Sequence, residues 1–127
     1  MAYRILLVDD SLIVRRMMKK TLELTDIEIS DVLEANNGKE GLEVLRNEWV
    51  DLVFLDINMP IMNGMEFMKV VREDPELNST PVIVVSTEGS RERRDQLFDM
   101  HVKAFIRKPV TPEALSETIT SVLGGKS

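Results

Sequence analysis

Four short apolar segments of this sequence each end on a polar side chain that could bind a metal ion or a phosphoryl group. The polar ends are Asp9-Asp10 after residues 4–8, Asp56 after 51–55, Ser86 after 81–85 and Lys108 after 104–107. In an open α/β sheet, ligands bind just beyond the carboxyl ends of parallel strands, where the strand order switches. If these segments are neighbouring parallel strands, carboxylates, a hydroxyl and an ammonium group meet in one crevice. Such a set suits a divalent cation together with a phosphoryl group.

Each of these polar residues also has a simpler structural interpretation. Asp9 or Asp10 could cap the following helix, because an aspartate oxygen accepts hydrogen bonds from free helix amides. Asp56 and Ser86 could be turn residues, and Lys108 could be a surface lysine. The combination of these residues favours a binding site for a cation. Carboxylates about 4 Å apart repel each other by roughly 4 kcal/mol at an effective dielectric of about 20, so a cluster of them is stable only beside a cation. A carboxylate held beside a cation can attack phosphorus and form an acyl phosphate.

The segments along the chain alternate between strand and helix. Short, continuous apolar segments rich in β-branched residues predict parallel strands that are covered on both faces. We expect strands near residues 4–9, 29–35, 51–56, 81–86 and 104–107. The expected helices begin after Asp10, near Gly38, near Gly64, at Arg91 and at Pro112. Ser90 and Thr111 are the expected caps of the last two helices, and Gly124 is the expected end of the last.

The helix after Asp10 has two contrasting faces. Residues at helical spacing predict a buried stripe, which consists of Ile13, Val14, Met17, Met18, Thr21 and Leu24. The opposite, basic face carries Arg15, Arg16, Lys19 and Lys20. This basic face is either a solvated helix surface or, together with Leu12, a docking site for a partner protein.

The composition excludes several classes of protein. A length of 127 residues predicts one domain, and 43% apolar and 30% charged residues are typical of a globular protein. The net charge of −6 argues against binding to nucleic acid or to an anionic membrane surface. The absence of cysteine excludes disulfides and thiolate metal sites. Because no apolar run reaches membrane-spanning length and the N-terminus lacks a signal-peptide pattern, we expect a cytoplasmic protein without membrane insertion.

Four segments of the chain resemble the sequence motifs of one protein family. They are residues 7–11, residues 55–66, residues 80–86 and residues 105–109. Each motif alone is weak evidence, but the four in this order and at these spacings are very specific. Together they resemble the receiver domain of bacterial response regulators, and most of all its stand-alone chemotaxis (CheY-like) type. The resemblance covers nearly the whole chain.

The resemblance implies a fold and a domain organisation. The implied fold is a flavodoxin-like, three-layer α/β sandwich with five helices and a five-stranded parallel sheet in the order 2-1-3-4-5. Residues 1–127 would form a single receiver domain without an output domain. The protein would be a monomer.

The resemblance also implies the residues of a Mg²⁺ site. Asp56 would be the phosphorylated residue and a metal ligand. Asp10 would bind Mg²⁺ directly, and Asp9 chiefly through water. Asn58 would supply its backbone carbonyl to the metal, and its side chain would face the reacting phosphorus.

Three further residues would respond to the phosphoryl group. Lys108 would pair with it, and the bond from Lys108 to Pro109 is a candidate cis peptide. Ser86 would be the switch hydroxyl. Phe105 would be the aromatic residue that turns inward when Ser86 is drawn toward the phosphate, although it lacks the hydroxyl of the tyrosine usual in chemotaxis members.

The implied function is a phosphorylation-activated signalling switch of a two-component system, not an enzyme beyond its own phosphorylation and dephosphorylation. A histidine kinase or a phosphotransfer protein would donate the phosphoryl group. A downstream protein would bind the face formed by the helix from Arg91, the strand at 104–107 and the helix from Pro112. Three alternatives stay open: a Mg²⁺-dependent phosphohydrolase that uses an aspartyl phosphate, a phosphorelay intermediate or phosphate sink, and an interaction module that is not phosphorylated.

Overall fold

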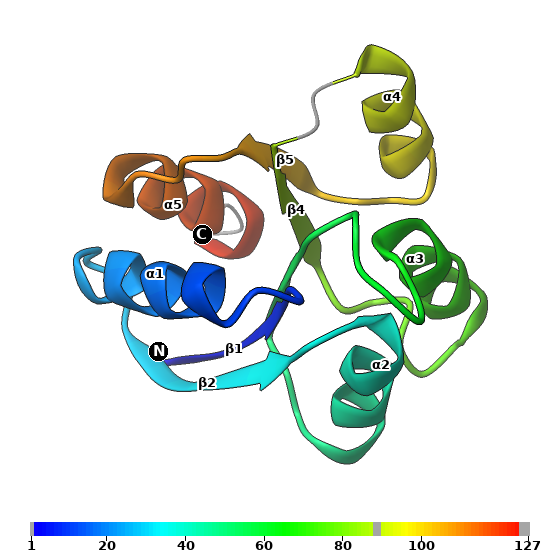
Figure 1. The fold of residues 1–127 in the computed structure, drawn as a ribbon. Coiled ribbons are helices and arrows are strands. Elements are labelled where there is room, and N and C mark those ends of the chain that lie inside the picture. The colour runs from blue at the N-terminus through cyan, green and yellow to red at the C-terminus, as the bar shows by residue number, and fades with distance from the viewer. Residues whose placement is uncertain (1, 88–89, 125–127) are drawn as a thin grey trace.

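The computed structural model describes residues 2–87 and 90–124, and it alternates strands with helices (Figure 1). The strands are β1 (Tyr3–Val8), β2 (Ile29–Ala35), β3 (Leu52–Leu55), β4 (Val82–Ser86) and β5 (Ala104–Arg107). The helices are α1 (Leu12–Glu23), α2 (Gly38–Asn47), α3 (Gly64–Glu73), α4 (Arg91–Asp99) and α5 (Pro112–Ile119). A π-helical segment, Thr120–Gly124, follows α5. The elements lie where the sequence predicted them, apart from small shifts at strand ends.

The five strands form one parallel sheet in the order β2-β1-β3-β4-β5, which confirms the predicted topology. Helices α1 and α5 cover one face of the sheet, and α2, α3 and α4 cover the other (Figure 1). The chain first adds β2 on one side of β1 and then adds β3 on the other side, so the strand order switches between β1 and β3. The carboxyl ends of these two strands therefore flank the crevice in which such sheets bind ligands.

Alternation along the strands builds two separate cores. Leu6 and Val53 point into the core under α2 and α3, whereas Ile5 and Phe54 point into the core under α1 and α5. Burying each such side chain fully contributes about 1.5–3 kcal/mol to folding. The sheet is thus a rigid platform whose strand ends hold their positions firmly.

Each of the five α-helices begins at a capping side chain that accepts a hydrogen bond from a backbone N–H three residues later. The caps are Ser11, Asn37, Asn63, Ser90 and Thr111. The predicted caps of α4 and α5 are therefore confirmed. Within residues 2–87 and 90–124, no helix is both long enough and apolar enough to cross a membrane.

The predicted buried face of α1 is wrong in part. Three residues of the expected stripe remain largely exposed: Ile13 at 71%, Met17 at 61% and Leu24 at 73%. The helix buries Arg15, Met18 and Leu22 instead. Arg15 was expected on the basic, solvated face, but its guanidinium donates to the carbonyl oxygen of Asp9 and pairs with Glu34 at 2.8 Å. Because its donors are satisfied in this way, an arginine can be buried here at little cost.

Candidate functional site

The backbone brings the carboxylates of Asp9 and Asp56 to the same edge of the sheet. β1 and β3 are paired in parallel with Val8 opposite Leu55, so the residue that follows each strand emerges at the same level. The N–H of Asp56 donates to the carbonyl oxygen of Val8 at 2.9 Å, which extends the ladder by one step. The convergence that the sequence predicted for these strand ends is therefore present.

Three acidic side chains form a compact cluster at this edge. One carboxylate oxygen each of Asp9, Asp10 and Asp56 lies within 4.8 Å of the others. Asp9 is buried, Asp56 is half-buried and Asp10 is exposed, so the cluster opens toward solvent on one side. Hard carboxylate oxygens at this spacing, with one side open for waters, fit the coordination that Mg²⁺ prefers.

Neither Asp9 nor Asp10 is the cap of the following helix, but Asp9 contributes to the turn before it. The cap of α1 is Ser11, whose hydroxyl accepts from the N–H of Val14. Asp9 supports that cap, because one of its carboxylate oxygens accepts from the N–H of Ser11 at 2.9 Å. Its other oxygen faces the cluster, so Asp9 serves the turn and the site at the same time.

Lys108 reaches into the acidic cluster from the end of β5. Its ammonium nitrogen lies 3.0 Å from Oδ2 of Asp9 and 3.7 Å from Oδ1 of Asp56. The backbone N–H of Lys108 donates to the carbonyl oxygen of Ser86 at 3.0 Å, which ties the end of β5 to β4. The peptide bond to Pro109, which the sequence offered as a candidate cis bond, is cis. Lys108 is thus a largely buried lysine that bridges two carboxylates.

The electrostatics of the cluster act on the pKa of Asp56. Burial raises the pKa of its carboxyl above the usual range, and the negative charges of Asp9 and Asp10 raise it further. The Lys108 ammonium and a hydrogen bond from the N–H of Ile57 work in the opposite direction. A divalent cation bound between the three carboxylates would relieve the repulsion that remains.

Gly64, at the start of α3, lets this helix approach the site closely. A Cβ atom at this position would lie 2.5 Å from the backbone oxygen of Asp56 and 2.9 Å from Cα of Ile57. Neither backbone atom can move without shifting the strand end, so only glycine fits here. The sequence predicted only that a helix begins near Gly64, and it did not predict the close approach to Asp56.

The remaining predicted residues lie around the cluster. Asn58 is exposed in the loop after β3. Ser86 ends β4 and is 1% exposed. Phe105 on β5 is half-buried and packs against the core under α3 and α4. Sequence reasoning placed Arg15 on the basic face of its helix and missed its position behind Asp9, because an arginine in an amphipathic helix is normally solvated.

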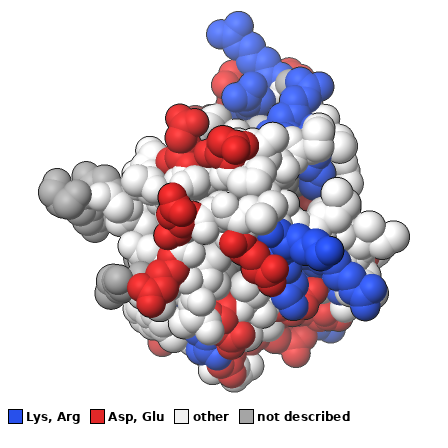
Figure 2. All heavy atoms as spheres, turned by 90° about the vertical axis from the view of Figure 1, so that its left-hand side faces the viewer, with Lys and Arg blue, Asp and Glu red and all other residues white. Residues whose placement is uncertain are grey.

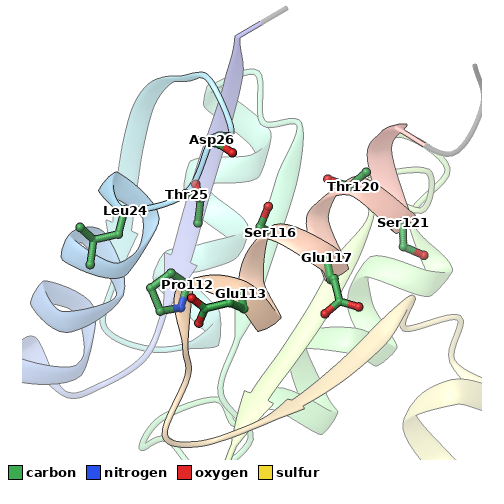
Figure 3. Close-up of a pocket in the computed structure, with 9 residues that line it drawn as sticks. All are labelled: Leu24, Thr25, Asp26, Pro112, Glu113, Ser116, Glu117, Thr120 and Ser121. Carbon is green, nitrogen blue, oxygen red and sulfur yellow. The ribbon is translucent and has the colours of Figure 1, made fainter.

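Several grooves lie outside the acidic cluster. A mostly apolar groove of about 260 Å³ runs beside Lys108, and its lining residues are Val14, Met17, Met18, Thr21, Thr87, Lys108, Pro109 and Val110. A larger groove of about 650 Å³ lies between the end of α1 and α5 (Figure 3), and its lining residues are Leu24, Thr25, Asp26, Pro112, Glu113, Ser116, Glu117, Thr120 and Ser121. The larger groove includes none of the predicted site residues.

Comparisons with known proteins agree with this architecture. The Response regulator receiver domain family matches residues 5–120. The chain is 41% identical over 122 residues to the chemotaxis protein CheY homolog of Campylobacter jejuni, covering 95% of this chain and 92% of the relative. It is 39% identical over 122 residues to the chemotaxis protein CheY1 of Helicobacter pylori, covering 95% and 97%. The solved structure of the chemotaxis response regulator CheY4 of Vibrio cholerae superposes with a TM-score of 0.83 at 33% identity, covering 97% of this chain and all of that one.

Proposed function

The chain belongs to the response regulator receiver domain family, and from this premise we propose that Asp56 is the residue through which it is switched. The protein is a phosphorylation-activated signalling switch of a two-component system, and its relatives are chemotaxis proteins. The observation that carries the assignment to Asp56 is the position of Lys108, whose ammonium group bridges Asp9 and Asp56. A lysine held there can neutralise a phosphoryl group as well as a carboxylate.

In the proposed reaction, a carboxylate oxygen of Asp56 attacks the phosphorus of a phosphohistidine on the donor protein. An O–P bond forms, the N–P bond breaks, and the histidine leaves with the electron pair of that bond. The ammonium group of Lys108 would then pair with the new phosphoryl oxygens instead of with the carboxylates. A Mg²⁺ ion held by Asp9, Asp10, Asp56 and the backbone carbonyl of Asn58 would supply positive charge to the same oxygens. The same residues would serve in the later hydrolysis of the acyl phosphate.

Switching would follow from new contacts to the phosphoryl group. Ser86 would donate its hydroxyl to a phosphoryl oxygen and move toward it, and Phe105 would turn into the space that is vacated. Such a change at the end of β4 biases the face of α4, β5 and α5, where we place the binding site of the downstream partner. That face carries Arg91, Arg93 and Arg94 on α4 and Phe105 on β5.

We place the phosphodonor, a histidine kinase or phosphotransfer protein, on the exposed part of α1. Ile13 and Met17 leave an apolar strip beside the groove that borders Lys108. Arg16 and Lys20 are exposed on the same helix, whereas Lys19 is bound to Glu34 at 3.3 Å. Figure 2 shows basic side chains on this side of the molecule, with acidic side chains next to them. An apolar strip with a basic rim suits a donor surface that is apolar and acidic.

The assignment of Asp56 is tested by labelling with acetyl phosphate in the presence of Mg²⁺. The wild-type protein should take up about one phosphoryl group, and Asp56→Asn should take up none, because an amide is a poor nucleophile. Asp51→Asn is a suitable control, since Asp51 lies at the opposite end of β3. Stoichiometric labelling of Asp56→Asn would place the phosphoryl group on another residue.

We also expect a cytoplasmic location and a monomeric resting state.

A further inference from the structure

Helix α4 is held to the rest of the protein by few buried side chains. Of its nine residues only Leu97 is buried, and Phe98 is 43% exposed. The cap Ser90 bonds to Arg93 within the helix itself and does not anchor it to another element. In Figure 1, α4 stands beyond β5 at the rim of the molecule. A single weak contact can therefore influence where this helix and its neighbours rest.

One such contact joins α4 to β5. The guanidinium carbon of Arg94 lies 5.1 Å from the centroid of the Phe105 ring, within the range of a cation–π interaction. Within the described parts of the chain, Arg94 forms no ion pair with an acidic residue. Among the described residues, the Phe105 ring is the contact that positions this guanidinium group.

The ring beneath Arg94 lies on the same face of the sheet as Ser86. Val84 is paired with Phe105, and Ser86 is paired with Arg107. Residues two apart on a strand point to the same face, as do paired residues on neighbouring strands. Phe105 and Ser86 therefore share a face, with the ring half-buried at the surface under Arg94 and the hydroxyl buried deeper.

We propose that Arg94 is a latch that holds Phe105 in its resting, surface position until phosphorylation draws Ser86 away. The proposal rests on the switching role assigned to Phe105 above. A ring that turns toward Ser86 moves out from under the guanidinium and loses the cation–π contact. An exposed contact of this kind favours the state that contains it by about two- to fivefold. Arg94 is thus a positioning residue that sets how strongly the unphosphorylated protein resists switching.

The latch makes a prediction about ligand binding through linkage. A phosphate mimic that stabilises the inward ring binds the inward state. Its apparent affinity is therefore lower when more of the protein is in the resting state. If the latch is removed, beryllofluoride with Mg²⁺ should bind about two- to fivefold more tightly. Simple loss of a positive charge would change the affinity for this anion in the opposite direction, so the two explanations differ in sign.

The experiment compares Arg94→Ala with Arg91→Ala. The second variant also removes one positive charge from α4, but it leaves the contact between Arg94 and the Phe105 ring in place. Beryllofluoride affinity is measured by NMR titration in Mg²⁺, and the ring-proton shifts of Phe105 are followed in the free protein. Arg94→Ala should bind more tightly and shift the free ring signals toward their bound positions. Arg91→Ala should match wild type, and Arg94→Lys should restore part of the wild-type behaviour. Equal affinities of Arg94→Ala and Arg91→Ala would overturn the latch.

A double-mutant cycle tests whether the effect passes through the ring. In a Phe105→Leu background, Arg94→Ala should leave the beryllofluoride affinity unchanged, because no ring remains to be held. A persisting gain in that background would contradict the proposal. If the wild-type protein itself failed to bind beryllofluoride with Mg²⁺, the proposed phosphorylation site would be wrong, and the latch with it.

Discussion

At the scale of single residues, Lys108 offsets part of the repulsion among the carboxylates of the acidic cluster. Three carboxylate oxygens within 4.8 Å of one another destabilise the folded state unless cations lie among them. Lys108 partly meets this need at 3.0 Å from Asp9 and 3.7 Å from Asp56. The cluster still offers oxygen ligands on its open side, where Asp10 is exposed. We therefore expect a divalent cation to bind with the help of Asp10.

Replacing Asp10 by alanine should weaken Mg²⁺ binding by about tenfold or more, since a hydrogen bond or ligand contact to a charged group is worth about 1.5–3 kcal/mol. The affinity can be measured by NMR titration of amide shifts at the ends of β1 and β3. Asp26→Ala is a control of equal charge, because Asp26 lines the distant groove between α1 and α5 (Figure 3). Equal loss in both variants would mean that only overall charge matters.

Replacing Ser86 by alanine should separate the chemistry of the site from the switch. Asp56, the other carboxylates and Lys108 stay in place, so labelling by acetyl phosphate should continue. Coupling to the face of α4, β5 and α5 should be lost, because no hydroxyl draws the end of β4 toward the phosphoryl group. Allosteric coupling is typically about 1–3 kcal/mol, so the variant should lose most of a roughly five- to 150-fold gain in partner affinity.

The readout for Ser86→Ala is partner affinity with and without beryllofluoride, after a pull-down has identified the partner. Ser79→Ala, in the exposed loop before β4, is the control for the loss of a hydroxyl. Retention of the full phosphorylation-dependent gain would make Ser86 an ordinary strand-end residue. The same pull-down separates a downstream switch from a phosphate sink, since a sink should capture no partner in the beryllofluoride form.

At the scale of elements, α1 carries two kinds of surface on one helix. Its buried ridge includes Met18 and Leu22, and its exposed strip includes Ile13 and Met17. Exposed apolar side chains beside a basic rim are typical of a protein interface rather than of a solvated helix. The strip borders the groove next to Lys108, so a donor bound there would place its phosphoryl group near the acidic cluster.

Replacing Ile13 by serine should slow phosphotransfer from the donor protein by about fivefold or more, because truncating a central interface residue typically costs more than about 1 kcal/mol. Labelling by acetyl phosphate should be unchanged, since this small donor needs no docking surface. Leu24→Ser is a matched control at the far end of α1, with 73% exposure against 71% for Ile13. Equal rates with the protein donor in both variants would move the docking surface elsewhere.

At the scale of the whole molecule, the acidic cluster links stability to pH. The pKa of Asp56 is raised in the folded protein, chiefly by burial, so the folded state holds this proton more readily than the unfolded chain does. Where the folded state binds more protons, stability falls as the pH rises. The contribution of Asp56 is therefore fully present below the usual aspartate pKa of about 4 and is lost as the pH rises through the raised value.

Asp56→Asn should accordingly be more stable than wild type at neutral pH without Mg²⁺. The difference should shrink as the pH is lowered toward about 4, where the unfolded-state aspartate also becomes protonated. Added Mg²⁺ should stabilise wild type more than the variant, because it binds the folded cluster. Urea denaturation at several pH values measures these changes. A variant less stable than wild type at neutral pH without Mg²⁺ would contradict the cause assigned to the raised pKa.

Much of this protein could be predicted from the sequence alone. The alternation of strand and helix, the caps Ser90 and Thr111, and the strand ends that carry Asp9, Asp56 and Lys108 all follow from local pattern. Periodicity and capping depend on neighbours within a few residues, which the sequence lists directly. The four motifs, which lie at the ends of β1, β3, β4 and β5, also pointed to the family by resemblance, and that resemblance implied the sheet order.

Tertiary structure alone decided which side chains meet across the fold. The sequence determined that α1 is amphipathic, but the shape of the sheet and α5 decided that Met18 is buried and Met17 is not. Arg15 is buried because Glu34 and the Asp9 carbonyl happen to surround it. Arg94 lies over Phe105 because α4 folds back beside β5. Such contacts depend on distances between segments that are remote in sequence, and a local pattern carries no information about those distances.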